Sequence, residues 1–307
     1  MQNRAKFLLI LLAGCIAAGL LSCHSGPPTE QPSPLPSSEL FSMDNAKKLP
    51  AGSRYIEPIF KEVTVTKDIP FSQAMDYQGR EQTLLLDIYC PKGDTAENRP
   101  AIIWVHGGGF TEGNKDGNME TTLGEAFARK GYVSASINYR LRADRDSDWD
   151  GTLGDAVTDA HTALQWLIDH STEYGIDPGH IALCGYSAGA ITVTGLAYNN
   201  GINLPETTGG SVFAVVNMAG GSYGLGDISP SAPPCLILHG SVDDTVPFMG
   251  AAQCSEALTA AGVENTFYVM DGISHDLYNH VLEIEDVVTI FLYEKLTGTK
   301  PDIPIRK

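Results

Sequence analysis

Beyond about residue 61 the chain alternates short apolar runs with segments of helical period. Several runs are continuously apolar, which is typical of central strands covered on both faces. Strands come first and strict strand–helix alternation follows. This predicts an α/β fold with about eight strands in one mostly parallel sheet, an antiparallel start and helices on both faces. The expected strands are Val63–Thr66, Leu84–Tyr89, Ala101–Val105, Val133–Asn138, Ile181–Cys184, Phe213–Met218, Cys235–His239 and Thr266–Val269. The expected helices are Glu120–Lys130, Leu153–His170, Ala188–Tyr198, Gly250–Ala261 and Leu282–Leu296.

The composition is that of an ordinary globular protein: 43% of the 307 residues are hydrophobic, and there are 32 Gly and 18 Pro. These values exclude a collagen, a coiled coil and a mainly disordered chain. Acidic residues outnumber basic ones by 37 to 20, which gives a formal net charge of −17. Because phosphate binding needs clustered Lys and Arg, this balance argues against nucleic acid as a partner. It also argues against docking on an anionic membrane through a basic patch.

The N-terminal segment has the pattern of a secretory signal. Arg4 and Lys6 precede an apolar run over residues 7–21, which is shorter than the roughly 20 residues that a transmembrane helix needs. The run ends in a Leu-Leu-Ser-Cys sequence at Cys23, which resembles the bacterial lipobox, where the Cys is lipidated after cleavage. We therefore predict a lipoprotein signal peptide over residues 1–22 and lipidation at Cys23.

Two other interpretations of this segment stay open. A Leu-Ala-Gly-Cys sequence that ends at Cys15 matches the lipobox consensus better, but it leaves only a stub of the apolar region before it. The segment could also remain uncleaved as an anchor helix, although its length disfavours this.

The composition of the segment after Cys23 is typical of an extended tether. Residues 24–42 contain five Pro and five Ser and almost no aliphatic residue, so they cannot bury a core. We predict a lipidated Cys and a Pro/Ser-rich tether over residues 23–55, and one folded domain over residues 56–300. This arrangement predicts an exported lipoprotein of a bacterium, in the periplasm or on the outer membrane, which meets the membrane only through its lipid anchor.

Four cysteines remain in the predicted domain: Cys90, Cys184, Cys235 and Cys254. Their spacings suggest no small disulfide framework, although an exported protein could pair them. Cys184 and Cys235 lie in apolar runs, which favours buried free thiols that pack as small hydrophobic side chains. No CxxC sequence or His/Cys cluster indicates a zinc site.

The sharpest local signal is Gly185-Tyr186-Ser187-Ala188-Gly189, between an expected strand and an expected helix. Glycines two residues before and after Ser187 allow a turn tight enough to expose a strained serine hydroxyl. The G-x-S-x-G pattern alone is weak, but this strand–turn–helix context makes it specific. The alternative is an ordinary turn in which Ser187 only caps the helix.

A serine nucleophile needs a neighbouring base, and the base needs an orienting carboxylate. In this architecture the order along the chain is Ser, then acid, then His. Asp243 and Asp244 follow one expected strand, and His275 follows the next. With Ser187, these groups fall beyond the carboxyl ends of parallel strands, where ligands bind in open α/β sheets.

Two other histidines are less suited to the role of the base. His239 ends a strand and precedes both candidate acids, so its order is wrong. His280 enters the last helix and is interpreted as a surface or capping group. A metal pair of His275 and His280 would lack a third ligand.

An acyl-transfer site also needs preorganised donors for the oxyanion. The sequence His106-Gly107-Gly108-Gly109-Phe110 follows the strand that ends at Val105, and its glycines let backbone N–H groups converge. We expect the N–H groups of Gly108, Gly109 and Ala188 to form an oxyanion hole. A phosphate-binding loop is the rival, but the dinucleotide spacing fails at Glu112 and no Gly-Lys-Ser/Thr occurs.

With these motifs the chain resembles the α/β-hydrolase superfamily over about residues 60–297, in the His-Gly-Gly-Gly carboxylesterase branch. It is similar to hormone-sensitive-lipase-type esterases and to bacterial feruloyl and acetyl-xylan esterase domains. The resemblance also rests on Ile137–Leu141, Gly175–Pro178 and the His-Gly-x-x-Asp-x-x-Val-Pro sequence at 239–247. That last sequence implies that the acid is Asp243 rather than Asp244.

The resemblance implies a serine carboxylesterase without a cofactor. Only residues 219–234 separate two late strands, so we expect a minimal cap and an open site. An open site suits short-chain or aromatic acyl esters, such as acetyl or feruloyl groups on plant polysaccharide, so the expected substrate is a small-molecule or polysaccharide-linked ester. A lipase, a peptidase-like serine hydrolase and a non-catalytic binding protein of the same fold are the alternatives.

One further sequence, Asp146-x-Asp148-x-Asp150-Gly151, matches the start of a calcium loop. Its twelfth position is Val157, where a bidentate Glu should stand. We therefore favour a solvated acidic loop over a metal site.

Overall fold

The computed structural model describes residues 52–198, 201–202, 204, 208–223 and 225–307. The predicted signal peptide, both candidate lipidation cysteines and most of the predicted tether lie outside the described residues. Within the described part, no helix combines the length and the apolar character needed to cross a membrane.

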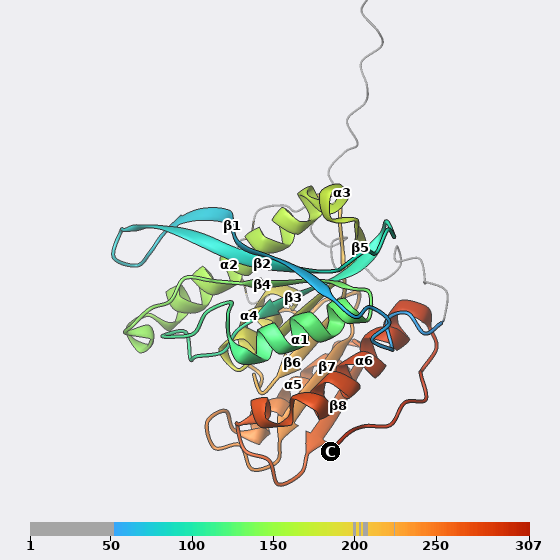
Figure 1. Cartoon of the computed structure of the whole chain (residues 1–307). Helices are drawn as coiled ribbons and strands as arrows, with labels where there is room; N and C mark the ends of the chain where they lie inside the picture. Colours follow the sequence, from blue (N-terminus) through green and yellow to red (C-terminus); the bar gives the residue numbers. More distant parts are fainter. Residues whose placement is uncertain (1–51, 199–200, 203, 205–207, 224) are drawn as a thin grey trace, which may run out of the picture. The chain divides into compact units, whose positions relative to one another are not determined.

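The expected α/β fold is confirmed as one eight-stranded sheet in the order β1-β2-β4-β3-β5-β6-β7-β8 (Figure 1). β1 pairs antiparallel with β2 and β2 antiparallel with β4, whereas all pairs from β4 to β8 are parallel. The strands are β1 Val63–Met75, β2 Glu81–Pro91, β3 Arg99–Val105, β4 Val133–Ile137, β5 Ile176–Tyr186, β6 Val212–Met218, β7 Cys235–Gly240 and β8 Asn265–Met270.

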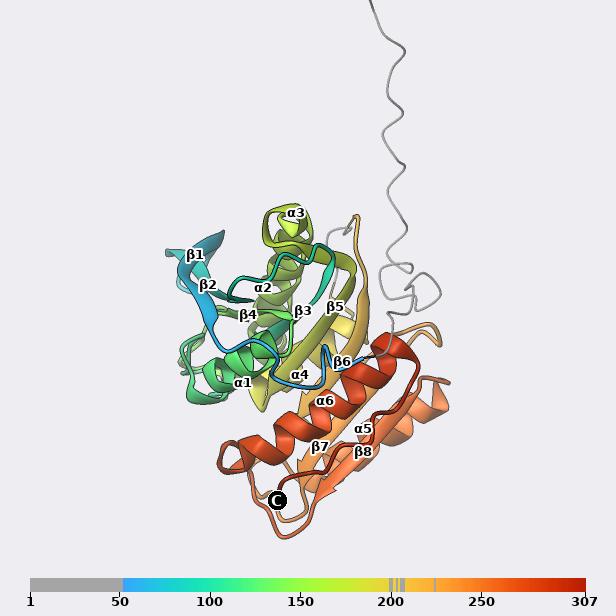
Figure 2. The same cartoon turned by 45° about the vertical axis from the view of Figure 1, so that its right-hand side comes forward.

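Helices cover both faces of the sheet because its central strands are apolar on both sides. In β3, Ile103 and Val105 join the core under α2, α4 and α5, and the alternating Ile102 and Trp104 join the core under α1 and α6 (Figure 2). The helices are α1 Asn118–Arg129, α2 Trp149–Asp169, α3 Ser171–Tyr174, α4 Ala188–Ala197, α5 Phe248–Ala260 and α6 Val281–Thr297, with 3₁₀ turns η2 Arg145–Ser147 and η3 Leu277–His280.

Several strands are longer than the apolar runs predict, β1 and β5 by the most residues. β1 extends to Met75 because edge pairing with β2 continues where the side chains are mostly exposed, through two shifts of register. β5 begins at Ile176 rather than at Ile181 because Ile176 pairs with β3 across an irregular step. In both cases backbone pairing extends a strand beyond its hydrophobic signal.

All four cysteines of the described part are free thiols. Cys184, Cys235 and Cys254 are buried, and Cys90 is half-buried. The prediction that Cys184 and Cys235 pack as small hydrophobic side chains is confirmed.

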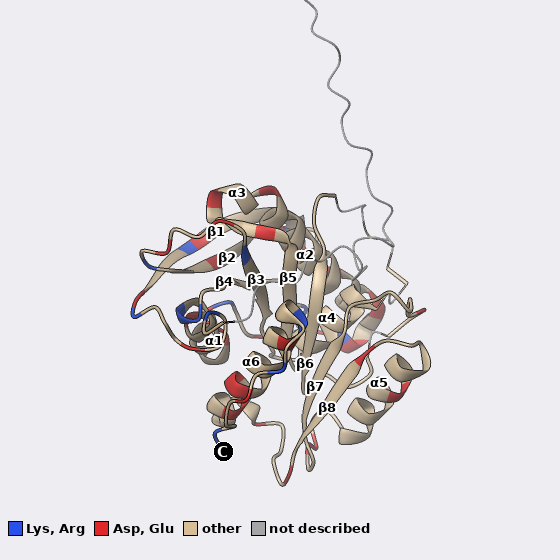
Figure 3. Ribbon diagram, turned by 90° about the vertical axis from the view of Figure 1, so that its right-hand side faces the viewer, with Lys and Arg blue, Asp and Glu red and all other residues tan. Residues whose placement is uncertain are grey.

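The carboxyl ends of the parallel strands lie at one edge of the sheet and carry the loops that follow β3, β5, β7 and β8. Among the described residues of the connection from β6 to β7, residues 219–234, no helix or strand intervenes. In Figure 3 the Asp and Glu positions are spread over several elements, including α3, α5 and α6. The acidic charge is therefore not gathered on a single element.

Candidate active site

Ser187 lies in a strained turn between β5 and α4. Its φ of 53° falls in the left-handed region that non-glycine residues rarely adopt. A Cβ on Gly185 would lie 2.2 Å from the Gly189 carbonyl oxygen, and one on Gly189 would lie 2.0 Å from that of Val105. The turn therefore needs both glycines, and its backbone is fixed by the Ser187 N–H, which donates to the Met218 carbonyl at 2.8 Å.

The structure brings Ser187, His275 and Asp243 into one hydrogen-bonded row. His275 Nε2 lies 2.9 Å from Ser187 Oγ, and His275 Nδ1 lies 2.8 Å from Asp243 Oδ2. Ser187 is 88 residues from His275 in sequence, so only the parallel sheet makes them neighbours. In this row Nε2 of the imidazole faces the serine hydroxyl, and Nδ1 faces the carboxylate.

The two candidate acids occupy different surroundings. The side chain of Asp243 is fully buried, and its Oδ1 accepts the N–H groups of Thr245 and Val246 at 3.0 and 2.9 Å. Asp244 is exposed. The geometry therefore joins Asp243 to the histidine, as the motif implies.

The other two histidines lie elsewhere. His280 ends η3 and occupies the N-cap position of α6, and its side chain makes no capping hydrogen bond there. His239 is fully buried near the end of β7, and its Nε2 lies 3.3 Å from Asp243 Oδ2. Sequence order correctly separates His239 from Ser187 but does not reveal this contact.

Tyr186 holds the histidine loop in place. Its hydroxyl donates to the carbonyl oxygen of His275 at 2.7 Å, and the two rings stack with centroids 5.4 Å apart. Tyr186 is the last residue of β5 and directly precedes Ser187. The same turn therefore positions the Ser187 hydroxyl and the loop that carries the His275 imidazole.

In the glycine loop, residues 106–110, the carbonyl groups accept hydrogen bonds from neighbouring groups. The Gly107 carbonyl accepts the His106 Nδ1–H at 2.6 Å, and the Gly108 carbonyl accepts two backbone N–H groups, both at 3.1 Å. In a trans peptide the C=O and the following N–H point in opposite directions. The N–H groups of Gly108 and Gly109 are therefore free to face the cavity that these residues share with Ser187.

Ala188 completes this group of donors because it is the first residue of α4. The first-turn N–H groups of a helix have no partner within the helix, and the helix dipole adds positive potential there. The cavity beside Ser187 is lined by Gly108, Gly109 and Ala188 together.

His106 supports the glycine loop as a neutral ring. Burial lowers the pKa of His106 to about 4, so the ring is uncharged at neutral pH. It stacks on Tyr139 at a centroid distance of 4.3 Å, and the Tyr139 hydroxyl donates to the His106 carbonyl at 3.0 Å.

The far end of the glycine loop is held by the segment between β4 and α2. The Arg145 guanidinium donates to the Gly109 carbonyl at 2.6 Å, and the Arg142 N–H donates to the Phe110 carbonyl at 2.8 Å. Gly108, Gly109 and Phe110 all have positive φ, so this conformation needs external support. No motif pointed to Arg145.

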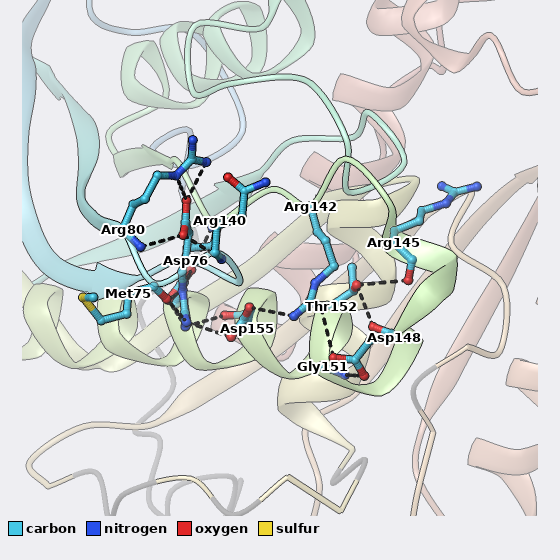
Figure 4. A network of polar contacts seen from close by, with 12 residues as sticks. Met75, Asp76, Arg80, Arg140, Arg142, Arg145, Asp148, Gly151, Thr152 and Asp155 are labelled. Atoms are coloured by element: carbon cyan, nitrogen blue, oxygen red, sulfur yellow. Dashed lines mark hydrogen bonds and ion pairs between the residues drawn. The ribbon is translucent and has the colours of Figure 1, made fainter.

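Figure 4 shows how that supporting segment is anchored on α2. The Thr152 hydroxyl donates to the carbonyl groups of Arg145 and Asp148 at 3.2 and 2.8 Å, and Arg142 pairs with Asp148 at 3.0 Å. The Arg145 guanidinium extends away from this network. Its backbone is thus fixed while its side chain reaches the glycine loop.

The acidic sequence at 146–150 is part of the same anchor. Asp148 caps α2 by accepting the Gly151 N–H at 3.0 Å, while Asp146 and Asp150 are exposed. In the described part of the chain, no group of three or more His, Cys, Asp or Glu side chains is arranged to hold a metal ion. Asp148 therefore has a structural role in starting the helix.

Ser187 opens into a cavity of about 730 Å³. Aromatic rings form much of its wall: Phe110 meets Trp149 edge-on with centroids 5.5 Å apart, and Trp149 meets Tyr223 at 6.2 Å. The lining residues are Gly108, Gly109, Phe110, Thr111, Glu112, Arg145, Asp146, Trp149, Tyr186, Ser187, Ala188, Ile191, Tyr223, Thr245, Val246 and His275. The cavity thus joins an apolar aromatic wall to the Ser187 hydroxyl and to the residues of the glycine loop.

Comparison with known proteins agrees with this geometry. The BD-FAE family model matches residues 86–220, which include the glycine loop and Ser187. Phenmedipham hydrolase of Pseudarthrobacter oxydans is 37% identical over 118 residues, 38% of this chain and 23% of that protein. Lipase 1 of Yarrowia lipolytica is 30% identical over 196 residues, 59% of this chain and 39% of that protein. The chain therefore spans well under half the length of these two relatives.

Solved structures share the fold. A structure of Thermogutta terrifontis esterase 2 phosphorylated by paraoxon superposes with a TM-score of 0.62 at 23% identity, covering 79% of this chain and 97% of that one. At this identity the likeness concerns the fold alone. The chain thus has the fold of this esterase, and over residues 86–220, which hold the glycine loop and the strained serine turn, it is similar to the BD-FAE family.

Proposed function

We propose that this chain is a serine carboxylesterase in which Ser187 is the nucleophile, His275 the general base and Asp243 the orienting acid. The observation that carries the proposal is the row of hydrogen bonds from Ser187 Oγ through His275 to Asp243, at 2.9 and 2.8 Å. Within this row the serine proton has an acceptor, and the imidazolium that forms has a carboxylate partner.

The reaction follows from these contacts. Ser187 Oγ attacks the ester carbonyl while His275 Nε2 takes its proton, and the N–H groups of Gly108, Gly109 and Ala188 stabilise the oxyanion. His275 then protonates the departing alcohol, which leaves an acyl-serine. Water, deprotonated by the same imidazole, releases the acid and restores Ser187. No step needs a cofactor.

A hydrolysis panel tests the proposal against its alternatives. It contains nitrophenyl esters from acetate to decanoate, methyl ferulate, acetylated xylan and an aminoacyl amide. Ester turnover without amide turnover is expected. Turnover of the amide alone would indicate a peptidase, and no turnover together with no labelling of Ser187 by paraoxon would indicate a non-catalytic binding protein.

For the substrate we propose short-chain or aromatic acyl esters, with acetyl or feruloyl groups on plant polysaccharide as the natural class. The rings of Phe110, Trp149 and Tyr223 in the cavity wall offer a flat apolar surface to such an acyl group. The described part of the 219–234 connection carries no helix that could act as a lid, so a bulky sugar alcohol can stay in solvent.

Along the nitrophenyl series we expect kcat/KM to be highest for short acyl chains and to fall toward decanoate. Each buried CH₂ contributes only about 0.8 kcal/mol, and an open site buries few of them. The measurement is kcat/KM for each chain length, with acetylated xylan oligosaccharides alongside. A steady rise toward ten or twelve carbons, or activation on emulsions, would instead identify a lipase.

A matched pair of tryptophan variants tests whether the aromatic wall sets this limit. Trp149→Ala removes a ring from the cavity and should move the optimum toward longer chains. Trp166→Ala removes a ring that stacks on His170 further along α2 and should leave the optimum unchanged. An identical chain-length profile for wild type and Trp149→Ala would exclude the wall as the determinant.

We further propose that the protein is exported and anchored through a lipid on Cys23. The support is the basic start, the short apolar run and the Pro/Ser-rich tether in the sequence. A diacylglycerol thioether together with an amide-linked acyl chain exceeds the two-signal threshold for stable anchoring.

Cys23→Ser should therefore move the protein from the membrane fraction to the soluble fraction, or leave its precursor unprocessed. Cell fractionation and labelling with a radioactive fatty acid measure the change, with Cys15→Ser as the matched control. Label that persists in Cys23→Ser but disappears in Cys15→Ser would assign the anchor to Cys15.

A further inference from the structure

His239 is a fully buried histidine that contacts the proposed catalytic acid from inside the protein. Its Nε2 lies 2.8 Å from the Val246 carbonyl oxygen and 3.3 Å from Asp243 Oδ2. A carbonyl oxygen can only accept, so Nε2 carries the hydrogen. The ring therefore donates its N–H to the Val246 carbonyl, and the same nitrogen lies beside Asp243 Oδ2.

The other ring nitrogen of His239 has no such use. Burial lowers the pKa of His239, which favours the neutral ring. With the hydrogen on Nε2, Nδ1 is an acceptor, and it is buried without a hydrogen-bond partner among the described residues. A buried polar atom without a partner is unfavourable, and an aliphatic side chain at this core position would avoid that cost. We therefore infer that the contacts of Nε2 offset the cost of burying Nδ1 without a partner.

The Asp243 carboxylate is held by contacts to both of its oxygens. Its Oδ1 accepts N–H groups from Thr245 and Val246, which belong to the same turn and move with it. Its Oδ2 accepts the His275 Nδ1–H at 2.8 Å and lies 3.3 Å from His239 Nε2. His239 lies in β7, which is paired with a strand on each side, so its hydrogen bond to the Val246 carbonyl ties the turn that carries the carboxylate to the sheet.

We propose that His239 is a positioning residue for the triad, which fixes the plane of the Asp243 carboxylate and the turn at 243–246 so that Oδ2 faces His275 Nδ1. This inference rests on the proposed function, in which Asp243 orients His275. The same Nε2–H holds the Val246 carbonyl, and Val246 itself lines the cavity beside Ser187. One ring thus links the acid, its turn and the cavity wall to the sheet.

Two polar replacements separate positioning from mere packing. His239→Gln places an amide N–H near the position of Nε2, so it can still reach the Val246 carbonyl and Asp243 Oδ2. In His239→Asn the side chain is shorter, so its amide lies near the position of Nδ1. From there it cannot reach the Val246 carbonyl or Asp243 Oδ2. Small displacements of a catalytic group cost up to about 100-fold, so we expect kcat to fall about 10- to 100-fold in His239→Asn and in His239→Leu, with KM little changed. His239→Gln should keep most of the wild-type kcat.

His180 provides a matched control. It is also a buried histidine with a carboxylate partner, Asp177, 2.9 Å from its Nδ1, and its Nε2 also has no hydrogen-bond partner among the described residues. It lies in the part of β5 that is remote from Ser187. His180→Leu should lower the thermal midpoint as a buried substitution does while kcat stays within about two-fold of wild type.

A second readout does not depend on turnover. The proton in the hydrogen bond between His275 and Asp243 should give a downfield ¹H NMR resonance in the free enzyme. It should persist in His239→Gln and in His180→Leu, and be lost or broadened in His239→Asn.

Equal kcat and an unchanged resonance in the Gln and Asn variants would overturn the inference even if His239→Leu fails to fold. A protein that hydrolyses no ester would contradict the proposed function. The resonance would then still decide whether His239 positions Asp243.

Discussion

Ser187→Ala is expected to abolish ester hydrolysis while the protein stays folded. Removing the nucleophile of a triad costs on the order of 10⁶ in kcat, because the remaining groups can then only polarise the ester and orient water. The fold should persist because the backbone N–H and C=O of Ser187, which bond to Met218 and to Ile191, are not changed. The measurement is kcat for nitrophenyl acetate, with circular dichroism and the thermal midpoint to verify folding.

Ser274→Ala is the matched control, since it removes a hydroxyl next to His275 that does not line the cavity. This variant should keep wild-type turnover. Labelling by paraoxon gives a second test, because attack by Ser187 Oγ should leave one phosphoryl group on the wild type and none on Ser187→Ala. Substantial turnover by the purified alanine variant, or a label on another serine, would contradict the assignment of the nucleophile.

Asp243→Asn should also be severely damaging, with a loss of about 10⁴ in kcat. The Asn side-chain oxygen can still accept the N–H groups of Thr245 and Val246, which leaves the amide nitrogen facing His275. An N–H group in that place cannot accept the His275 Nδ1–H, so the imidazole is no longer held with its acceptor nitrogen toward Ser187.

Asp244→Asn makes the same chemical change one residue along, on an exposed side chain. It should leave kcat and KM close to wild type. If Asp244→Asn were the inactive variant and Asp243→Asn the active one, the assignment of the acid would be wrong.

The features that the sequence predicted correctly are those that depend on local patterns of residues. Each expected strand and helix appears in the structure, because apolar periodicity is local and central parallel strands are apolar on both faces. The Gly185–Gly189 turn is equally local, since it depends on two residues on each side of Ser187. The order of serine, acid and histidine, each after a strand, placed three groups at one edge of the sheet.

The sequence was less informative wherever backbone pairing or a distant partner decided the outcome. It did not predict the full length of β1, because an edge strand with exposed side chains has little apolar signal. It did not identify Arg145 as the residue that holds the Gly109 carbonyl, 36 residues away. It set His239 aside as a base, and only the structure shows its contact with Asp243.

The sequence by itself thus determined the class of fold, the strained serine turn and the candidates for nucleophile, acid and base, since these depend on residue types at short spacings. The tertiary structure decided which groups support the glycine loop, which rings line the cavity and how His239 lies against Asp243. The first two depend on hydrogen bonds and contacts between residues that are tens of positions apart. Such partners are selected by how the strands pack, and no local pattern encodes that.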